Sequence, residues 1–166
     1  MQYPDFPGVE LPEAPRSPDE ERRHRKRMCA IGYRIFGAMR WGQLGDGHIS
    51  ARDPERTDHF WLLDWGVPFH AAPVDRLVLV GPGGRVENAA GEATGAVNTA
   101  GYHIHAPLLA ARPDVVSAAH THTQFGTPWS ANVRPFEALS QESCAFRFSQ
   151  SLFDDEDCLL YTSDAA

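Results

Sequence analysis

Apolar residues recur at helical spacing in the first third of the chain, directly after a pattern that favours a helix start. Ser17 can cap a helix, Pro18 suits its first position, and Glu20 completes a capping box. The apolar face that follows consists of Met28, Ile31, Ile35 and Met39. Because Gly42 supplies a stop, the spacing predicts a helix over residues 17–41.

Short apolar runs bounded by glycine and proline predict strands in the middle of the chain. Residues 59–63 form one such run, and residues 77–80 and 85–87 form a hairpin around the turn at 81–84. Residues 42–52 begin with several glycines and are predicted to form a loop that ends in the segment His-Ile-Ser-Ala-Arg.

The second half of the chain also mixes helix and strand patterns. Residues 100–112 are rich in alanine and leucine and predict a helix that contains Pro107. Residues 115–123 predict a strand whose first half is apolar enough to be buried, and Thr127 is a candidate cap for a short helix. Residues 144–148 favour one more strand. Helices combined with hairpin-connected strands predict an α/β sandwich with a largely antiparallel sheet.

One domain accounts for most of the chain. Five of the 13 prolines lie in the first 18 residues, so residues 1–16 are predicted to form an extended arm. The domain is expected to span residues 17–158, without an internal repeat. Residues 159–166 form an irregular tail with no clear element boundary, as expected of an incomplete reading frame.

Composition narrows the classes of partner. The formal net charge is -7, which repels phosphate backbones and argues against nucleic acid. The basic run at residues 22–27 is better explained as a solvated helix face. The sequence contains no run of about 18 apolar residues, so no membrane span is predicted. The three widely spaced cysteines indicate reduced thiols, as expected of a cytoplasmic protein. The partners are expected to be small molecules or other proteins.

Histidines supply the main candidate chemistry. His103, His105, His120 and His122 lie within twenty residues. Side chains two positions apart on a strand share a face, with Cα atoms about 6.5–7 Å apart, so His120 and His122 can bind one metal ion. Zinc needs at least one further protein ligand, which spacing alone does not identify. The alternative is a pair of polar residues that face solvent or each other.

Several segments resemble the class II aldolase/adducin family in order and spacing. Residues 98–105 (Asn-Thr-Ala-Gly-Tyr-His-Ile-His) precede the Ala-Arg-Pro-Asp-Val segment at 111–115 and the His-Thr-His-Thr segment at 120–123. Upstream, residues 47–54 resemble the glycine- and serine-containing substrate loop of the same family. The resemblance extends over residues 20–155.

The resemblance implies a fold, an assembly and a metal. Family members are three-layer α/β/α sandwiches with a mixed, largely antiparallel central sheet, and they commonly form tetramers. The resemblance makes His120 and His122 ligands of one Zn²⁺ ion, with a third histidine expected beyond Ala166. It also implies that Gly47, His48, Ser50 and Thr99 bind the substrate.

This sequence departs from the family pattern at three positions. Family aldolases carry a catalytic glutamate nineteen residues before the first metal histidine, where this chain has Gly101. His48 stands in place of an asparagine and Ala100 in place of a serine, which argues against a sugar phosphate as substrate. His105 lies one helical turn after Gly101 and is the candidate acid/base surrogate. The alternative for His105 is an interior histidine bonded to the backbone.

Two functions follow from these features. The leading one is a zinc-dependent lyase that cleaves a C–C bond of a small hydroxy-carbonyl compound by retro-aldol reaction or decarboxylation, through a metal-stabilised enediolate. Decarboxylation fits a site without the glutamate better, because loss of carbon dioxide needs no prior removal of a proton. The alternative is a non-catalytic adducin-like module for protein association, which Gly101 favours.

Overall fold

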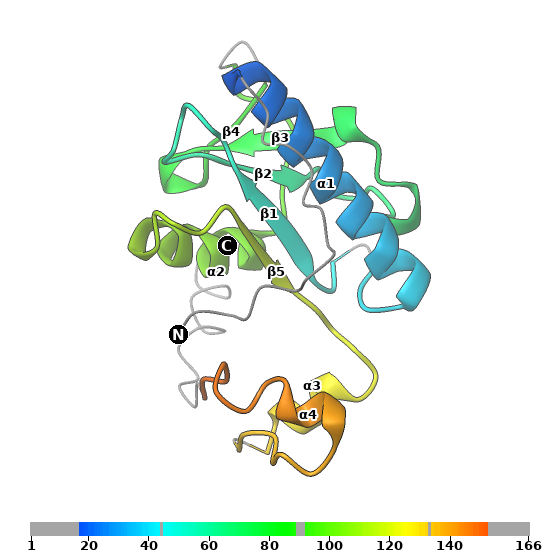
Figure 1. Cartoon of the computed structure of the whole chain (residues 1–166). Coiled ribbons are helices and arrows are strands. Elements are labelled where there is room, and N and C mark those ends of the chain that lie inside the picture. Colours follow the sequence, from blue (N-terminus) through cyan, green and yellow to red (C-terminus); the bar gives the residue numbers. More distant parts are fainter. Residues whose placement is uncertain (1–16, 44, 89–91, 133, 153–166) are drawn as a thin grey trace.

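A computed structural model of the chain is shown in Figure 1. The residues that it describes are 17–43, 45–88, 92–132 and 134–152. The predicted arm at 1–16, the domain end at 158 and the tail at 159–166 therefore lie outside the described residues. Within the described part, no helix is long and apolar enough to cross a membrane. Cys29 and Cys144 are both free.

Helices and strands are mixed along the chain. In chain order the elements are α1 (Pro18–Met39), β1 (His48–Arg52), β2 (Phe60–Leu63), η1 (Phe69–Ala71), η2 (Val74–Arg76), β3 (Leu77–Val80), η3 (Pro82–Gly84), β4 (Val86–Glu87), α2 (Thr99–Ala111), β5 (Ser117–His120), α3 (Gly126–Ser130) and α4 (Gln141–Cys144).

The first helix begins as the sequence predicts. The Ser17 hydroxyl accepts the backbone N–H of Glu20 at 3.3 Å, and the Glu20 carboxylate accepts the backbone N–H of Ser17 at 2.9 Å. The helix ends earlier than the glycine suggests, because Arg40 adopts a left-handed conformation with φ of 57°. The Arg40 N–H donates to the carbonyl of Gly37 and closes the helix there.

The five strands form one sheet in the order β4-β3-β2-β1-β5. Every pairing between these strands is antiparallel. The predicted hairpin is confirmed, with Leu79 opposite Glu87 and Val80 opposite Val86. Residues 48–52 correct the sequence analysis: they are not the end of a loop but strand β1, paired with β2 on one side and β5 on the other.

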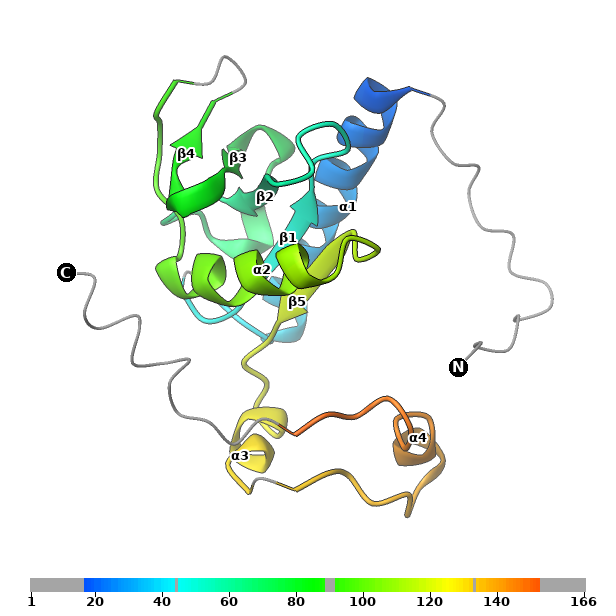
Figure 2. The same cartoon turned by 90° about the vertical axis from the view of Figure 1, so that its left-hand side faces the viewer.

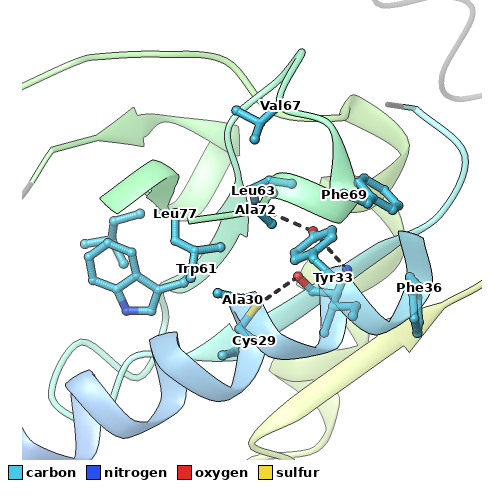
Figure 3. Packing of buried hydrophobic residues seen from close by; sticks show 13 residues of the cluster. Cys29, Ala30, Tyr33, Phe36, Trp61, Leu63, Val67, Phe69, Ala72 and Leu77 are labelled. Atoms are coloured by element: carbon cyan, nitrogen blue, oxygen red, sulfur yellow. Dashed lines mark hydrogen bonds between the residues drawn. The ribbon is translucent and has the colours of Figure 1, made fainter. Parts of the chain in front are cut away.

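The architecture has three layers, as predicted. Figure 2 shows α2 in front of the sheet and α1 behind it. On the α1 side, Tyr33 and Phe36 pack with Trp61 and Leu79 in a buried cluster (Figure 3). On the α2 side, a second buried cluster forms between the helix and the sheet, made of Phe60, Leu62, Val80 and Leu109. The chain thus has the α/β/α sandwich that the resemblance implies, with a sheet that is antiparallel throughout the described residues.

Strand β1 divides its side chains between the two helices. Ile49 and Ala51 belong to the cluster on the α1 side. His48, Ser50 and Arg52 alternate with them and are all buried, and each contacts a residue of α2 or the segment that follows it. The period of two along a strand therefore directs apolar groups to one helix and polar groups to the other. This second set positions the candidate site.

A tyrosine separates β1 from β2 near the site. The Tyr33 hydroxyl accepts the backbone N–H of Ile49 at 2.9 Å and that of Leu63 at 3.4 Å. It takes the place of ladder hydrogen bonds where the two strands diverge, since their register pairs only Ala51 with Trp61 and Arg52 with Phe60. Burial raises the pKa of Tyr33 above its usual value, which keeps the hydroxyl neutral.

The predicted burial of the last strand is wrong. β5 covers only residues 117–120, and Ser117 and Ala119 are exposed while Ala118 and His120 are half-buried. The reason is topological: β5 lies at the edge of the sheet, and only β1 pairs with it among the described strands. Apolar composition does not distinguish an edge strand built of alanine from a central one.

Two local predictions near the end of the described chain also fail. Residues 144–148 form no strand; Cys144 ends α4, whose capping box consists of Ser140 and Ser143, and turns follow. A short helix does form at Gly126–Ser130, but Thr127 does not cap it. The hydroxyl of Thr123 accepts the N–H of Gly126 at 2.8 Å instead.

Candidate metal centre

The two histidines at the end of β5 face each other. The Nε2 atoms of His120 and His122 are 2.9 Å apart, and their ring centroids are 4.8 Å apart. His120 is the last residue of the strand, and the N–H of His122 donates to the carbonyl of Trp41 at 2.8 Å. This bond ties the segment after the strand to the residues that follow α1. The two Nε2 atoms are close enough to share one cation.

A third histidine lies beside this pair on the neighbouring strand. His48 and His120 are opposite one another in the β1–β5 ladder. Side chains of such a pair lie on the same face of the sheet, and here the rings stack at 4.9 Å between centroids with 24° between planes. His48 is 3% exposed, so its ring forms a buried wall behind His120.

His105 holds His48 from the helix. Its Nε2 is 2.8 Å from Nδ1 of His48, and its Nδ1 is hydrogen-bonded to the hydroxyl of Ser50. Two tautomer arrangements satisfy these contacts: Ser50 donates to His105, which donates to His48, or the direction of both bonds is reversed. His105 is 1% exposed. It is thus an interior histidine, as in the alternative to an acid/base role, although its partners are side chains rather than backbone.

Glycines allow the close approaches that this arrangement needs. A Cβ at Gly101 would lie 3.1 Å from Cγ of His48, so the ring occupies the space that a side chain from this helical position would enter. Gly47 has φ of 95°, and a Cβ there would lie 2.8 Å from the carbonyl oxygen of His120. Side chains at either position would force the histidines or the backbone to move.

The structure therefore gathers most of the sequence-predicted residues in one place. Gly47, His48 and Ser50 join His105 and the pair of His120 and His122 through the contacts described above. Thr99 is the first residue of α2 and its side chain is exposed. His103 points to a different neighbour, since its ring contacts Tyr102 edge to face at 5.3 Å.

Burial keeps these imidazoles neutral. Desolvation, followed by the neighbouring histidines, lowers the pKa of His48 to about 3 and that of His105 to about 4. Burial and His122 lower the pKa of His120 as well. A neutral imidazole offers the nitrogen lone pair that zinc requires. The donor set of His120 and His122 therefore fits a divalent cation.

The described residues supply two of the ligands of such a site. Among them, no cluster of three or more histidine, cysteine, aspartate or glutamate side chains has metal-binding geometry. The third histidine expected from the resemblance stays a prediction.

Sequence reasoning missed one residue that organises the site. The Asn98 side-chain oxygen accepts the N–H groups of Ala100 at 2.9 Å and Gly101 at 3.3 Å, which caps α2. Its side-chain N–H donates to the carbonyl of Gly45 at 2.8 Å and so joins the glycine loop to the helix. The signal was available, because asparagine directly before a helical segment is a preferred N-cap.

A cavity lies elsewhere on the α2 side. It has a volume of about 790 Å³, and Phe60, Tyr102, Leu109 and the turn at Pro82 contribute to its walls. The paired histidines His120 and His122 do not line it.

Comparison with known proteins decides the family. The model of the Class II Aldolase and Adducin N-terminal domain matches residues 26–162. The chain belongs to this family.

Relatives of this class II aldolase/adducin domain include named enzymes. The chain is 34% identical over 146 residues to decarboxylase NovR of Streptomyces niveus, and the alignment covers 87% of this chain and 53% of that protein. An L-fuculose 1-phosphate aldolase from Glaciozyma antarctica PI12 superimposes with a TM-score of 0.78 at 30% identity, over 93% of this chain and 63% of that one.

Relatives of the adducin branch are found as well. The class II aldolase/adducin domain described here is 31% identical over 133 residues to alpha-adducin of Rattus norvegicus, covering 77% of this chain and 18% of that protein. The chain spans about half the length of the curated relatives that head the comparison. Family membership therefore comes with relatives of both enzymatic and adducin type.

Proposed function

We propose that this chain forms the zinc-binding part of a lyase of class II aldolase type, which cleaves a C–C bond of a small hydroxy-carbonyl compound by retro-aldol reaction or decarboxylation. The observation that carries the proposal is the convergence of the His120 and His122 Nε2 atoms, 2.9 Å apart. Two ring nitrogens at that separation can bind one Zn²⁺ ion with bonds of about 2.0–2.1 Å.

The residues around the pair have separate roles in this proposal. A zinc ion in such a site acts as a Lewis acid that polarises a carbonyl oxygen. His120 and His122 would hold it, while Gly47 leaves room for the carbonyl of His120 and Ser50 is hydrogen-bonded to His105. His105 is buried with both ring nitrogens engaged, so a proton from it reaches the site only through His48.

Of the two reactions, we propose decarboxylation. The position where family aldolases carry a glutamate is Gly101, and the His48 ring fills the adjoining space. A site with no carboxylate there suits a reaction that leaves an electron pair on carbon without prior removal of a proton. The similarity to a protein named as a decarboxylase supports the same choice.

Zinc content and product analysis test the proposal. We expect the purified protein to hold stoichiometric zinc by elemental analysis, and His120→Ala and His122→Ala to lose it. His103→Ala is the matched control, because His103 lies on α2 and contacts Tyr102. Carbon dioxide release from small hydroxy-carbonyl acids distinguishes decarboxylation from retro-aldol cleavage. Absence of stoichiometric zinc, with activity that survives a chelator, would overturn the proposal.

The second candidate is a non-catalytic module for protein association. It is favoured by the similarity to alpha-adducin and by Gly101. A complete reading frame with a long basic or coiled-coil tail would support this candidate. A downstream histidine followed by glycine on a predicted strand would support the lyase. Under either function we propose a cytoplasmic homo-oligomer, a tetramer by resemblance, which sedimentation of the purified protein tests.

A further inference from the structure

The contacts of His48 distinguish it from a substrate-binding residue alone. Its ring is 3% exposed and lies between α2 on one side and His120 on the other. The face turned to His120 is nearly parallel to that ring, at 24°. His48 therefore touches a candidate metal ligand over a ring face, where it can restrict how that ligand turns.

Two residues of α2 determine where the His48 ring lies. His105 fixes Nδ1 of His48 by a hydrogen bond of 2.8 Å, and Ser50 fixes His105 in turn. Gly101 leaves the adjacent space open, since a Cβ there would lie 3.1 Å from Cγ and 3.4 Å from both Cβ and Cδ2 of His48. The ring is thus held by a hydrogen bond and accommodated by a missing side chain.

His120 needs such support because of its place in the sheet. It ends an edge strand that pairs only with β1 among the described strands, and it is half-buried. A histidine side chain with one open side retains rotamer freedom that cation binding must remove. Contacts to the ligand from outside the coordination sphere reduce that freedom, and their loss typically weakens metal binding about 10- to 100-fold.

We propose that His48 is a positioning residue for His120, and that Gly101 is required at its position because it admits the His48 ring. This inference rests on the proposed function, because it assumes that His120 binds a divalent cation. It makes two of the three departures from the family pattern, at His48 and Gly101, a single coupled pair. The ring that replaces asparagine occupies the space next to the glycine that replaces glutamate.

The first experiment measures zinc affinity by calorimetric titration and the visible spectrum of the cobalt-loaded chain. We expect His48→Ala to weaken zinc binding about 10- to 100-fold and to shift the cobalt bands. His48→Phe keeps a ring face against His120 and is expected to recover much of that loss. Both variants remove the hydrogen bond between His48 and His105, so the difference between their zinc affinities measures the contribution of the ring. His103→Ala, on the same helix, is expected to bind zinc as the unmodified chain does.

The second experiment couples His48 to Gly101 in a double-mutant cycle. Gly101→Ala is expected to weaken zinc binding, although alanine favours a helix and the unfolding midpoint should not fall in parallel. In the His48→Ala background the added methyl group has no ring to displace. We therefore expect Gly101→Ala to cause no further loss there, which is the non-additivity of residues in direct contact.

The outcomes separate this inference from the proposed function. Zinc affinity unchanged in His48→Ala, or a Gly101→Ala effect that is the same with and without His48, overturns the positioning role and leaves the lyase proposal standing. An unmodified chain that binds zinc no better than His120→Ala overturns both. Weakened binding in His48→Ala with recovery in His48→Phe supports the inference.

Discussion

The two ends of β1 both place buried polar side chains against the α2 side, and they satisfy those groups in different ways. At its C-terminal end, Arg52 donates to the carbonyl oxygens of Val115 and Arg112 at 3.0 Å, and also to that of Leu109 at the end of α2. Next to it, the carboxylate of Asp53 is fully enclosed by donors. The hydrogen-bond partners of both side chains belong to the described fold.

The N-terminal end of β1 is held by neutral groups instead. His48 and Ser50 are both hydrogen-bonded to His105. This series of side-chain contacts ends at the half-buried ring of His120 rather than at another structural partner. The comparison teaches that buried polarity has two uses on one strand. The charged end closes the contact between sheet and helix, whereas the neutral end leads to the facing ring nitrogens of His120 and His122.

The strongest expected effect comes from removing the guanidinium at the charged end. Arg52→Met retains most of the apolar stem but leaves several backbone carbonyls near α2 without a donor. We expect the free energy of unfolding to fall by about 3–5 kcal/mol, measured by urea denaturation. Arg112→Met is the control, since Arg112 pairs with Asp114 at an exposed position and no measurable change is expected. Equal midpoints for the two variants would contradict the structural role of Arg52.

The next largest effect tests the carboxylate beside it. Asp53 accepts from Arg22 at 2.8 Å and from the indole of Trp61 at 3.1 Å, and its side chain is 1% exposed. We expect Asp53→Asn to cost about 2–3 kcal/mol, less than a fully buried pair because Arg22 is partly exposed. Glu55→Gln removes another carboxylate that Arg22 contacts, which is 55% exposed, and should change little.

Acid titration sharpens the test of Asp53. Burial raises the pKa of this carboxyl, but Arg22 and the N–H groups of Arg56 and Glu55 outweigh it and lower the pKa to about 2 from 3.8. Because the folded-state pKa is depressed, the stabilisation is present above about pH 4 and is lost as the pH falls toward 2. Asp53→Asn should lack this component of the unfolding curve. An unchanged pH dependence would show that Asp53 is not paired in the folded state.

The neutral end should respond to acid at a higher pH. The pKa of His105 is lowered to about 4 from 6.5 by burial and by His120. The unfolded chain therefore binds more protons between these values, and stability falls with decreasing pH by up to about 1.4 kcal/mol per pH unit for each such histidine. His105→Gln should cost about 1–2 kcal/mol at neutral pH and flatten this slope, measured in the presence of chelator.

The helices and strands that carry this comparison were largely predictable. The capping box at Ser17 and Glu20, the apolar run at 60–63 and the hairpin of β3 and β4 are local patterns, and each was found where the sequence predicts it. Local patterns decide these elements because caps and turns act over a few residues.

The remaining features depend on contacts between distant segments. The sequence assigned residues 48–52 to a loop because glycines precede them, yet pairing with both β2 and β5 makes them a strand. The bond between His48 and His105 joins positions 57 residues apart, and the stacking on His120 depends on ladder register. No spacing rule along one segment gives such neighbours, so the His-x-His pair was predictable while its buried wall was not.

The smallest expected effect on stability belongs to the residue nearest the proposed chemistry. His122 is exposed, lies beyond the end of β5, and contributes its backbone N–H rather than its side chain to the fold. We expect His122→Ala to change the unfolding free energy of the metal-free chain by less than about 0.5 kcal/mol. With zinc present, the unmodified chain should gain stability by mass action while His122→Ala should not. A large loss of stability in the metal-free variant would place His122 among the structural groups, as at the charged end of β1.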